Sequence, residues 1–161
     1  MERLKYLVIH CTATVEHKHY DKRDVIAWHT NPKTLGGRGW KVPGYNDLVL
    51  LDGTLESIVP FNTDEYVDNW EISNGAKGVN DVARHICYVG GLDAKGRPKD
   101  TRTKAQKTTL ETYIKYMILR HPDILVGGHY MFSKKTCPNF KVETWLLNVG
   151  VPMKNILNEL Y

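Results

Sequence analysis

Residues 4–10 read LKYLVIH, a short run rich in β-forming side chains, and the polar segment CTATVEHKHYDKRD follows at 11–24. An apolar run of this length, bounded by polar residues, is typical of a buried strand. We therefore expect a strand at 4–10 that places His10 at its end.

Two further apolar runs flank a short turn. Residues 45–51 (YNDLVLL) and 54–59 (TLESIV) lie on either side of Asp52 and Gly53. An Asp-Gly pair between apolar runs is a strong local signal for a β-hairpin. The pattern predicts two antiparallel strands here, and the run RHICYV at 84–89, closed by two glycines, predicts another strand.

The clearest helix is expected over 104–120, where apolar residues recur at helical spacing and Thr103 with Gln106 forms a capping box. Asp21 is expected to cap a shorter helix that ends before Pro32. Two short helices are expected around 142–147 and 153–160. Together the elements predict an α/β fold with a central mixed β-sheet flanked by α-helices.

The composition fits one ordinary globular domain. The chain has 161 residues, of which 42% are hydrophobic and 25% are charged. A chain of about 150 residues buries roughly 70% of its extended surface, enough for one core without disulfide bonds. We expect a single domain over 1–161.

The net charge of +4 is spread along the chain without long basic runs, so nucleic-acid binding is not indicated. No stretch approaches the roughly 18 apolar residues of a membrane span. Residues 1–13 lack the pattern of a secretory signal, so we expect the chain to be cytosolic as made.

The three cysteines, Cys11, Cys87 and Cys137, cannot all pair, so at least one is free. A free cysteine raises the question of metal or nucleophilic chemistry. His129 precedes Cys137 by eight residues, and His10 lies far away in the sequence. This spacing by itself is only a weak indication of a metal site.

An ordered series of short motifs runs through the chain: VIHCTAT at 8–14, AWH at 27–29, GW at 39–40, GYN at 44–46, the Asp-Gly hairpin, VGG at 89–91, GH at 128–129 and KTCPNF at 135–140. The series resembles the zinc-dependent N-acetylmuramoyl-L-alanine amidases of the phage lysozyme type and the related peptidoglycan recognition proteins. The resemblance covers about residues 6–140, and the helices expected over 142–161 add nothing to it.

The resemblance implies that Zn²⁺ is held by His10, His129 and Cys137 at the strand ends, with water in the fourth position. Three protein ligands and one open position distinguish a catalytic zinc site from a closed structural one. The implied reaction is hydrolysis of the amide bond between N-acetylmuramic acid and L-alanine in peptidoglycan, with the zinc-bound water as nucleophile.

Two further residues match catalytic positions of the family, Tyr45 in GYN and Lys135 two residues before Cys137. A phenol can orient or relay a proton, and an ammonium can stabilise the charge that develops on the oxyanion. The residues alone leave other interpretations open: Tyr45 at a strand start can serve packing, and Lys135 can simply be solvated, with its neighbour Lys134 as the competing lysine.

The sequence departs from the family at three places. Asn46 stands where phage amidases commonly have histidine. In this respect the chain resembles the recognition proteins. The segment 73–80 (SNGAKGVN) lacks the histidine that relatives tend to place shortly before the glycine, which affects a contact to the peptide and not the metal. His85 replaces a small glycine, and we expect it to be an ordinary strand histidine.

The sequence names no partner for the second ring nitrogen of a zinc-bound histidine, although Asp47 and Asp123 lie near the motifs. His29 can line the cleft or pack inside the core. Three tryptophans are candidate aromatic walls against sugar rings, although packing in the core is the more common role for each: Trp40, Trp70 and Trp145.

We expect a monomeric zinc amidase of a phage or prophage, an endolysin that acts on the cell wall after release or export. Its substrate would be peptidoglycan or a muropeptide. Two alternatives stay open. One is a peptidoglycan-binding module without turnover, although such modules commonly lose the cysteine that this chain retains as Cys137. The other is a zinc amidase that acts on soluble muropeptides.

Overall fold

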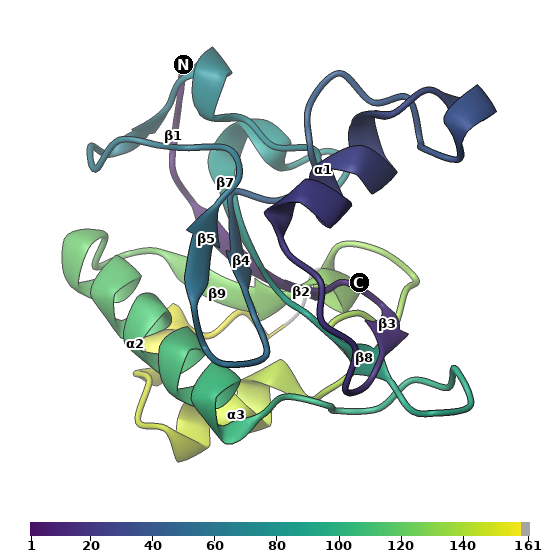
Figure 1. The fold of residues 1–161 in the computed structure, drawn as a ribbon. Helices are drawn as coiled ribbons and strands as arrows, with labels where there is room; N and C mark the ends of the chain where they lie inside the picture. The colour runs from purple at the N-terminus through teal and green to yellow at the C-terminus, as the bar shows by residue number, and fades with distance from the viewer. Residues whose placement is uncertain (159–161) are drawn as a thin grey trace.

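A five-stranded mixed sheet forms the centre of the computed structural model, which describes residues 1–158 (Figure 1). Its strands, in spatial order, are β5 (Leu55–Ser57), β4 (Asp47–Val49), β7 (Ala83–Tyr88), β2 (Tyr6–Cys11) and β9 (Leu125–Gly128). β5 runs antiparallel to β4, and the other neighbours are parallel. The expected mixed sheet is confirmed.

Three α-helices and two small ribbons complete the domain. The helices are α1 (Lys22–Thr30), α2 (Lys104–Arg120) and α3 (Val142–Asn148), and the ribbons pair β1 (Glu2–Arg3) with β6 (Tyr66–Val67) and β3 (Thr14–Val15) with β8 (Gly91–Leu92). Short 3₁₀ turns are η1 (Lys33–Leu35), η2 (Asn69–Glu71), η3 (Asn80–Val82), η4 (His129–Met131) and η5 (Met153–Asn155). Within residues 1–158 we find no helix with the length and apolar character of a membrane span.

The helices cover both faces of the sheet, α2 and α3 on one face and α1 on the other (Figure 1). Successive side chains of a strand point to opposite faces. In β2, Leu7, Ile9 and Cys11 therefore join the larger core cluster under α2 and α3. Cys87 of β7 belongs to the smaller cluster with Val25 of α1. His10, which alternates with Ile9 and Cys11, faces the α1 side.

The two longer helices begin where their caps predict. The Thr103 hydroxyl accepts the N–H of Gln106 at 3.1 Å, and the Gln106 side chain accepts the N–H of Thr103 at 3.0 Å. Asp21 caps α1 in the same reciprocal way with Asp24. Such caps satisfy N–H groups that the first turn of a helix leaves without partners.

The expected hairpin is present as β4 and β5, with three residues in each strand instead of the six or seven predicted. Gly53 has a φ of +86°, in the left-handed region that favours glycine. The N–H of Leu50 donates to the carbonyl of Thr54 at 2.9 Å and closes the turn.

The helix expected over 153–160 is wrong for the residues described. The chain makes only the 3₁₀ turn η5, and Ile156 then forms a parallel bridge with Val126 of β9. The N–H of Leu157 donates to the carbonyl of Val126 at 2.9 Å. Pairing with the open edge of β9 therefore replaces helical hydrogen bonds in this segment; residues 159–161 lie outside the described part.

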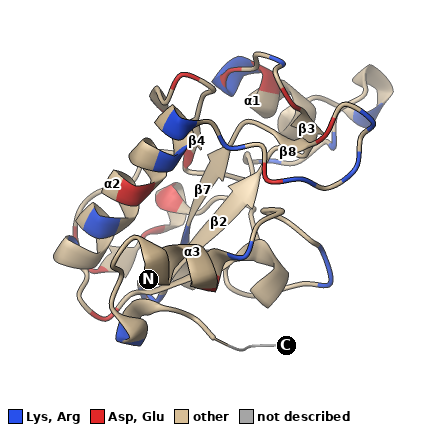
Figure 2. Cartoon of the chain, turned by 90° about the horizontal axis from the view of Figure 1, so that it is seen from below, with Lys and Arg blue, Asp and Glu red and all other residues tan. Residues whose placement is uncertain are grey.

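The charged residues of α2 are mostly basic but are separated along the helix, with Glu111 among them, in keeping with the absence of long basic runs (Figure 2). One ion pair is buried: Arg84 of β7 donates to Glu71 at 3.0 Å, with side-chain exposures of 1% and 0%. The Glu71 carboxylate also accepts the N–H groups of Asn62 and Asp68 at 2.6 and 2.7 Å. It thereby ties the 62–71 segment to the sheet.

We expect Glu71→Ala to lower the free energy of unfolding by about 3–5 kcal/mol, because it leaves the Arg84 guanidinium buried without its charge partner. Urea unfolding followed by circular dichroism measures the change. The control is Glu111→Ala, which breaks the more exposed pair with Lys115 on α2 and should cost less than about 0.5 kcal/mol. Equal losses in the two variants would contradict the prediction.

Candidate metal centre and catalytic cleft

The two candidate histidines lie side by side because their strands are parallel neighbours. Ile9 of β2 pairs with Gly128 of β9, so the next residues, His10 near the end of β2 and His129 just after β9, lie at the same edge of the sheet. Their ring centroids are 4.6 Å apart. The strand end that the sequence predicted for His10 is thus also the place of His129.

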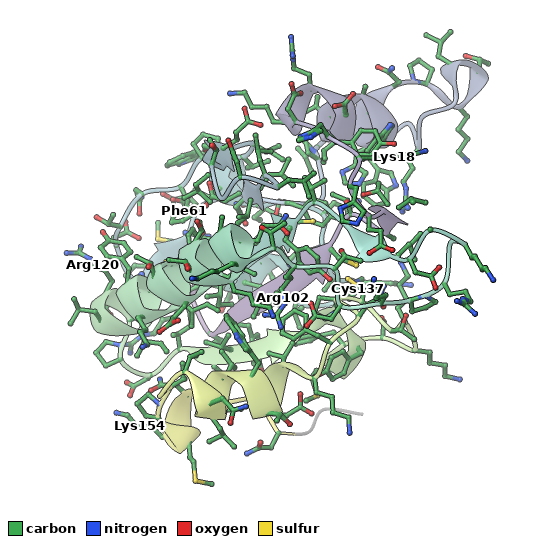
Figure 3. All side chains as sticks on the ribbon, turned by 60° about the horizontal axis from the view of Figure 1, so that its bottom comes forward. Lys18, Phe61, Arg102, Arg120, Cys137 and Lys154 are labelled. Atoms are coloured by element: carbon green, nitrogen blue, oxygen red, sulfur yellow. The ribbon has the colours of Figure 1, made fainter. Side chains whose placement is uncertain are left out.

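Cys137 reaches the same point from the loop that follows η4. The N–H of Tyr130 donates to the carbonyl of Cys137 at 2.9 Å, and the Tyr88 hydroxyl donates to that of Pro138 at 2.6 Å. The Cys137 sulfur accepts the N–H of Cys11 at 3.3 Å. Figure 3 shows Cys137 on the opposite side of the molecule from Arg120, the last residue of α2.

The three side chains are spaced as ligands of one ion would be. One nitrogen or sulfur atom from each of His10, His129 and Cys137 lies within 4.8 Å of the others, and His10 Nδ1 is 3.9 Å from Cys137 Sγ. Tetrahedral zinc with bonds of about 2.0–2.3 Å needs ligand atoms roughly 3.3–3.6 Å apart. The present separations are longer than this, so the side chains would have to move inward to hold the ion.

Burial keeps both imidazoles neutral. It lowers the pKa of His10 well below its ordinary value, and it lowers the pKa of His129 to about 4, with a further contribution from the positive charge of Lys135. A hydrogen bond with Cys11 and burial raise the pKa of the Cys137 thiol. A metal ion at this site would therefore find free imidazole lone pairs and would displace a proton from the thiol.

A cavity of about 120 Å³ opens beside the three side chains, and both Tyr45 and Lys135 line it. The Tyr45 ring centroid is 5.1 Å from that of His10. Burial raises the pKa of Tyr45 well above its ordinary value, so its phenol is protonated at neutral pH. Lys135 is exposed to solvent at the rim. The structure thus brings all five predicted site residues to one cavity.

His29 and Trp40 form another wall of the cavity. His29 Nδ1 accepts the N–H of Gly44 at 3.0 Å, and the ring centroids of His29 and Trp40 are 4.9 Å apart. Burial, with a smaller contribution from the positive charge of Arg38, lowers the pKa of His29 to about 4. His29 is therefore a neutral wall residue, which decides between the two interpretations of its sequence pattern.

The other two tryptophans do not line this cavity. Trp145 packs edge-on against Phe140, with centroids 5.7 Å apart, and under the Arg102 guanidinium. Trp70 lies in η2 and is 55% exposed. Of the three candidates, Trp40 is thus the one that lines the cavity, Trp145 takes the alternative packing role, and the wall role is wrong for Trp70.

His85 is the residue that sequence reasoning missed. Its Nδ1 lies 2.9 Å from His10 Nε2, and its side chain is fully buried. Neither aspartate considered earlier takes this place: Asp47 accepts the Tyr113 hydroxyl at 2.6 Å on the α2 side, and Asp123 borders a different cavity. The contact depends on strand register, which no local pattern in RHICYV reveals.

Asn46 holds the strands and loops behind the site. Its side-chain oxygen accepts the N–H of His85 at 2.8 Å and the hydroxyl of Ser73 at 3.1 Å. Its side-chain nitrogen donates to the carbonyls of Val59 and Glu71 at 3.1 and 2.9 Å. The residue is fully buried and uses both ends of its amide, so it has a structural role in this chain.

The departures at 73–80 and at 85 meet at one point in space. A Cβ added to Gly75 would lie 2.4 Å from Nδ1 of His85. The ring of His85 thus occupies the volume that a side chain at position 75 would need.

Comparisons of the sequence with known proteins identify a family and several relatives. The sequence model of the amidase type 2 family, described as N-acetylmuramoyl-L-alanine amidase, matches residues 1–140. The endolysin of Enterobacteria phage K11 is 28% identical over 138 residues, covering 86% of this chain and 82% of that protein. The endolysin of Escherichia phage T7 is 27% identical over 139 residues, covering 86% and 83%.

Solved structures share the fold. The N-acetylmuramoyl-L-alanine amidase LysC from Clostridium intestinale has a TM-score of 0.70 at 21% identity, covering 94% of this chain and 88% of its own. Bumblebee PGRP-SA has a TM-score of 0.72 at 16% identity, covering 99% and 87%. The match of the family model to most of the sequence, on a fold shared with these proteins, shows that this chain belongs to the N-acetylmuramoyl-L-alanine amidase family of type 2.

Proposed function

We propose that this protein hydrolyses the amide bond between N-acetylmuramic acid and L-alanine in peptidoglycan. The observation that carries the proposal is the convergence of His10, His129 and Cys137 on one cavity that Tyr45 and Lys135 also line. Membership of the amidase family and the likeness to phage endolysins support the choice of substrate.

We propose Zn²⁺ as the metal, held by His10, His129 and Cys137. Two neutral imidazoles and one thiol form a nitrogen and sulfur donor set that suits zinc, and three protein ligands leave a fourth position open. When bound, the ion supplies Lewis acidity toward a carbonyl and lowers the pKa of water to about 7.

Tyr45 and Lys135 supply the groups that a hydrolytic site needs besides the metal. The Tyr45 phenol keeps its proton at neutral pH, so it can orient the attacking water or the substrate by hydrogen bonding. The Lys135 ammonium at the rim can approach the substrate carbonyl and stabilise the negative charge that develops on its oxygen. His29 and Trp40 would hold the substrate from the other wall.

The complete set of polar groups favours catalysis over simple wall binding. A binding module needs neither a thiol ligand nor an ammonium beside the reacting carbonyl. We further propose that the protein acts as a monomeric endolysin, reaching the cell wall after release or export, in line with the endolysins among its relatives.

Digestion of purified peptidoglycan by the zinc-loaded and the chelator-stripped protein tests the function. We expect the zinc-loaded protein to release free stem peptides from intact glycan strands, as identified by mass spectrometry, and the stripped protein to release none until zinc is restored. Cleavage of soluble muropeptides alone would show that the intact wall is not the substrate. Wall retention without any product would indicate a binding module.

We expect Cys137→Ser to lose zinc and activity together while the chain still folds, because a hydroxyl is a much poorer zinc ligand than a thiolate. Metal content after dialysis measures the loss of zinc, release of stem peptides measures the loss of activity, and circular dichroism shows whether the chain still folds. Cys87→Ala is the matched control, since Cys87 is a buried core residue outside the ligand set; it should keep its zinc. Unchanged metal content in Cys137→Ser would remove Cys137 from the site.

We expect Lys135→Ala to keep zinc but to lower turnover by about 10²–10³-fold, the usual effect of removing one group that stabilises an oxyanion. The neighbouring Lys134→Ala is the control and should retain full turnover, because Lys134 does not line the cavity. Initial rates of stem-peptide release at saturating zinc measure both. A loss in Lys134→Ala instead would transfer the role to Lys134.

A further inference from the structure

We propose that His85 is a positioning residue for the metal ligand His10: it accepts a hydrogen bond from Nε2–H of His10 and so leaves Nδ1 of His10 free to bind zinc. The inference rests on the proposed function, because it concerns the same metal site. It adds a residue that belongs neither to the ligand set nor to the groups facing the substrate.

The two ring nitrogens of His10 have different neighbours. Nε2 lies 2.9 Å from Nδ1 of His85, a normal hydrogen-bond length. Nδ1 lies on the side of Cys137, 3.9 Å from its sulfur. The nitrogen directed at the metal ligands is therefore the one that does not contact His85.

Strand register produces this contact. β2 and β7 are parallel, with Val8 opposite His85 and His10 opposite Cys87. Residues two apart in a strand face the same side, so His10 and His85 are diagonal neighbours on the α1 face of the sheet. Both side chains are almost completely buried, at 1% and 0% exposure.

Proton positions link this hydrogen bond to metal binding. A neutral imidazole has one donor nitrogen and one acceptor nitrogen. If His85 donated to Nε2 of His10, the proton of His10 would sit on Nδ1 and block the metal. If His10 donates instead, its Nδ1 lone pair is free. A metal ligand fixed in this way usually binds more tightly than one with a free ring orientation.

The surroundings of His85 permit the required tautomer and hold its ring in place. Nε2 of His85 is buried without a hydrogen-bond partner among the described residues, so no other bond opposes a proton there. The main chain of His85 is fixed by Asn46, whose side-chain oxygen accepts its N–H. Gly75 covers the ring, and a Cβ at that position would come within 2.4 Å of Nδ1.

The first test measures zinc affinity by competition with a chromophoric chelator. We expect His85→Ala to weaken zinc binding by about 10–100-fold, the usual effect of losing such a partner. His85→Asn should recover most of the affinity, because the asparagine side chain can place an acceptor oxygen near the position of Nδ1. Ser73→Ala is the matched control: Ser73 is fully buried and hydrogen-bonds to Asn46, as His85 does, but it forms no hydrogen bond with His10.

Gly75→Ala perturbs the same contact without changing His85. Its added methyl group would displace the His85 ring, so we expect it also to weaken zinc binding. The backbone of Gly75 is not in the left-handed region, so its φ admits alanine, although the methyl group would also meet the carbonyl oxygen of Gly44 at 2.7 Å. Zinc affinity equal to the wild type in both His85→Ala and Gly75→Ala would overturn the proposal, and so would an equal loss in Ser73→Ala.

Imidazole nitrogen NMR of the zinc-loaded wild-type protein provides a test that needs no variant. We expect a proton on Nε2 of His10 and none on Nδ1 of His85; a proton on Nδ1 of His85 would overturn the inference. The outcomes separate the two proposals. A wild-type protein that binds no zinc contradicts the proposed function, whereas zinc binding that is indifferent to His85 contradicts this inference alone.

Discussion

The parallel pairing of β2 with β7 on one side and β9 on the other is the constraint on which the site depends. Parallel strands that run side by side end at one edge of the sheet, so groups that are distant in sequence meet there. This edge receives His10 from β2 and His129 from the residue after β9. The same pairing brings His85 behind His10. A register shift of one residue would turn His10 into the core under α2 and α3.

The buried polar groups behind the cleft, Asn46 and the Arg84–Glu71 pair, are tolerated because they have defined partners. Asn46 joins the hairpin, β7 and the segment around Ser73 through four hydrogen bonds. The pair of Arg84 and Glu71 ties the same region to the sheet. A buried amide or charge without such partners would be strongly destabilising, so these contacts fix where the loops run. The wall of the cleft thus depends on a polar layer behind it.

Both strands and connecting loops contribute side chains to the cavity. His10 and His129 come from strand ends, whereas Cys137, Tyr45 and Lys135 come from connecting segments held by hydrogen bonds to the core. Loop residues can approach a substrate, and the strands keep the ligand histidines at a fixed separation. The neutral imidazoles and the protonated phenol follow from burial. Strands and loops therefore set the positions of these groups, and burial sets their protonation.

Local signals in the sequence determined the elements: the apolar run before His10, the caps of α1 and α2, and the Asp-Gly hairpin all act over a few residues, so they could be predicted. The motif series also named the five residues that meet at the cavity. Tertiary structure alone decided the partner of His10, the packing of Trp145 against Phe140 away from the cleft, and the extended pairing of Ile156 with β9. These outcomes depend on strand register and on competition for hydrogen bonds between segments far apart in the chain, which only the folded arrangement fixes.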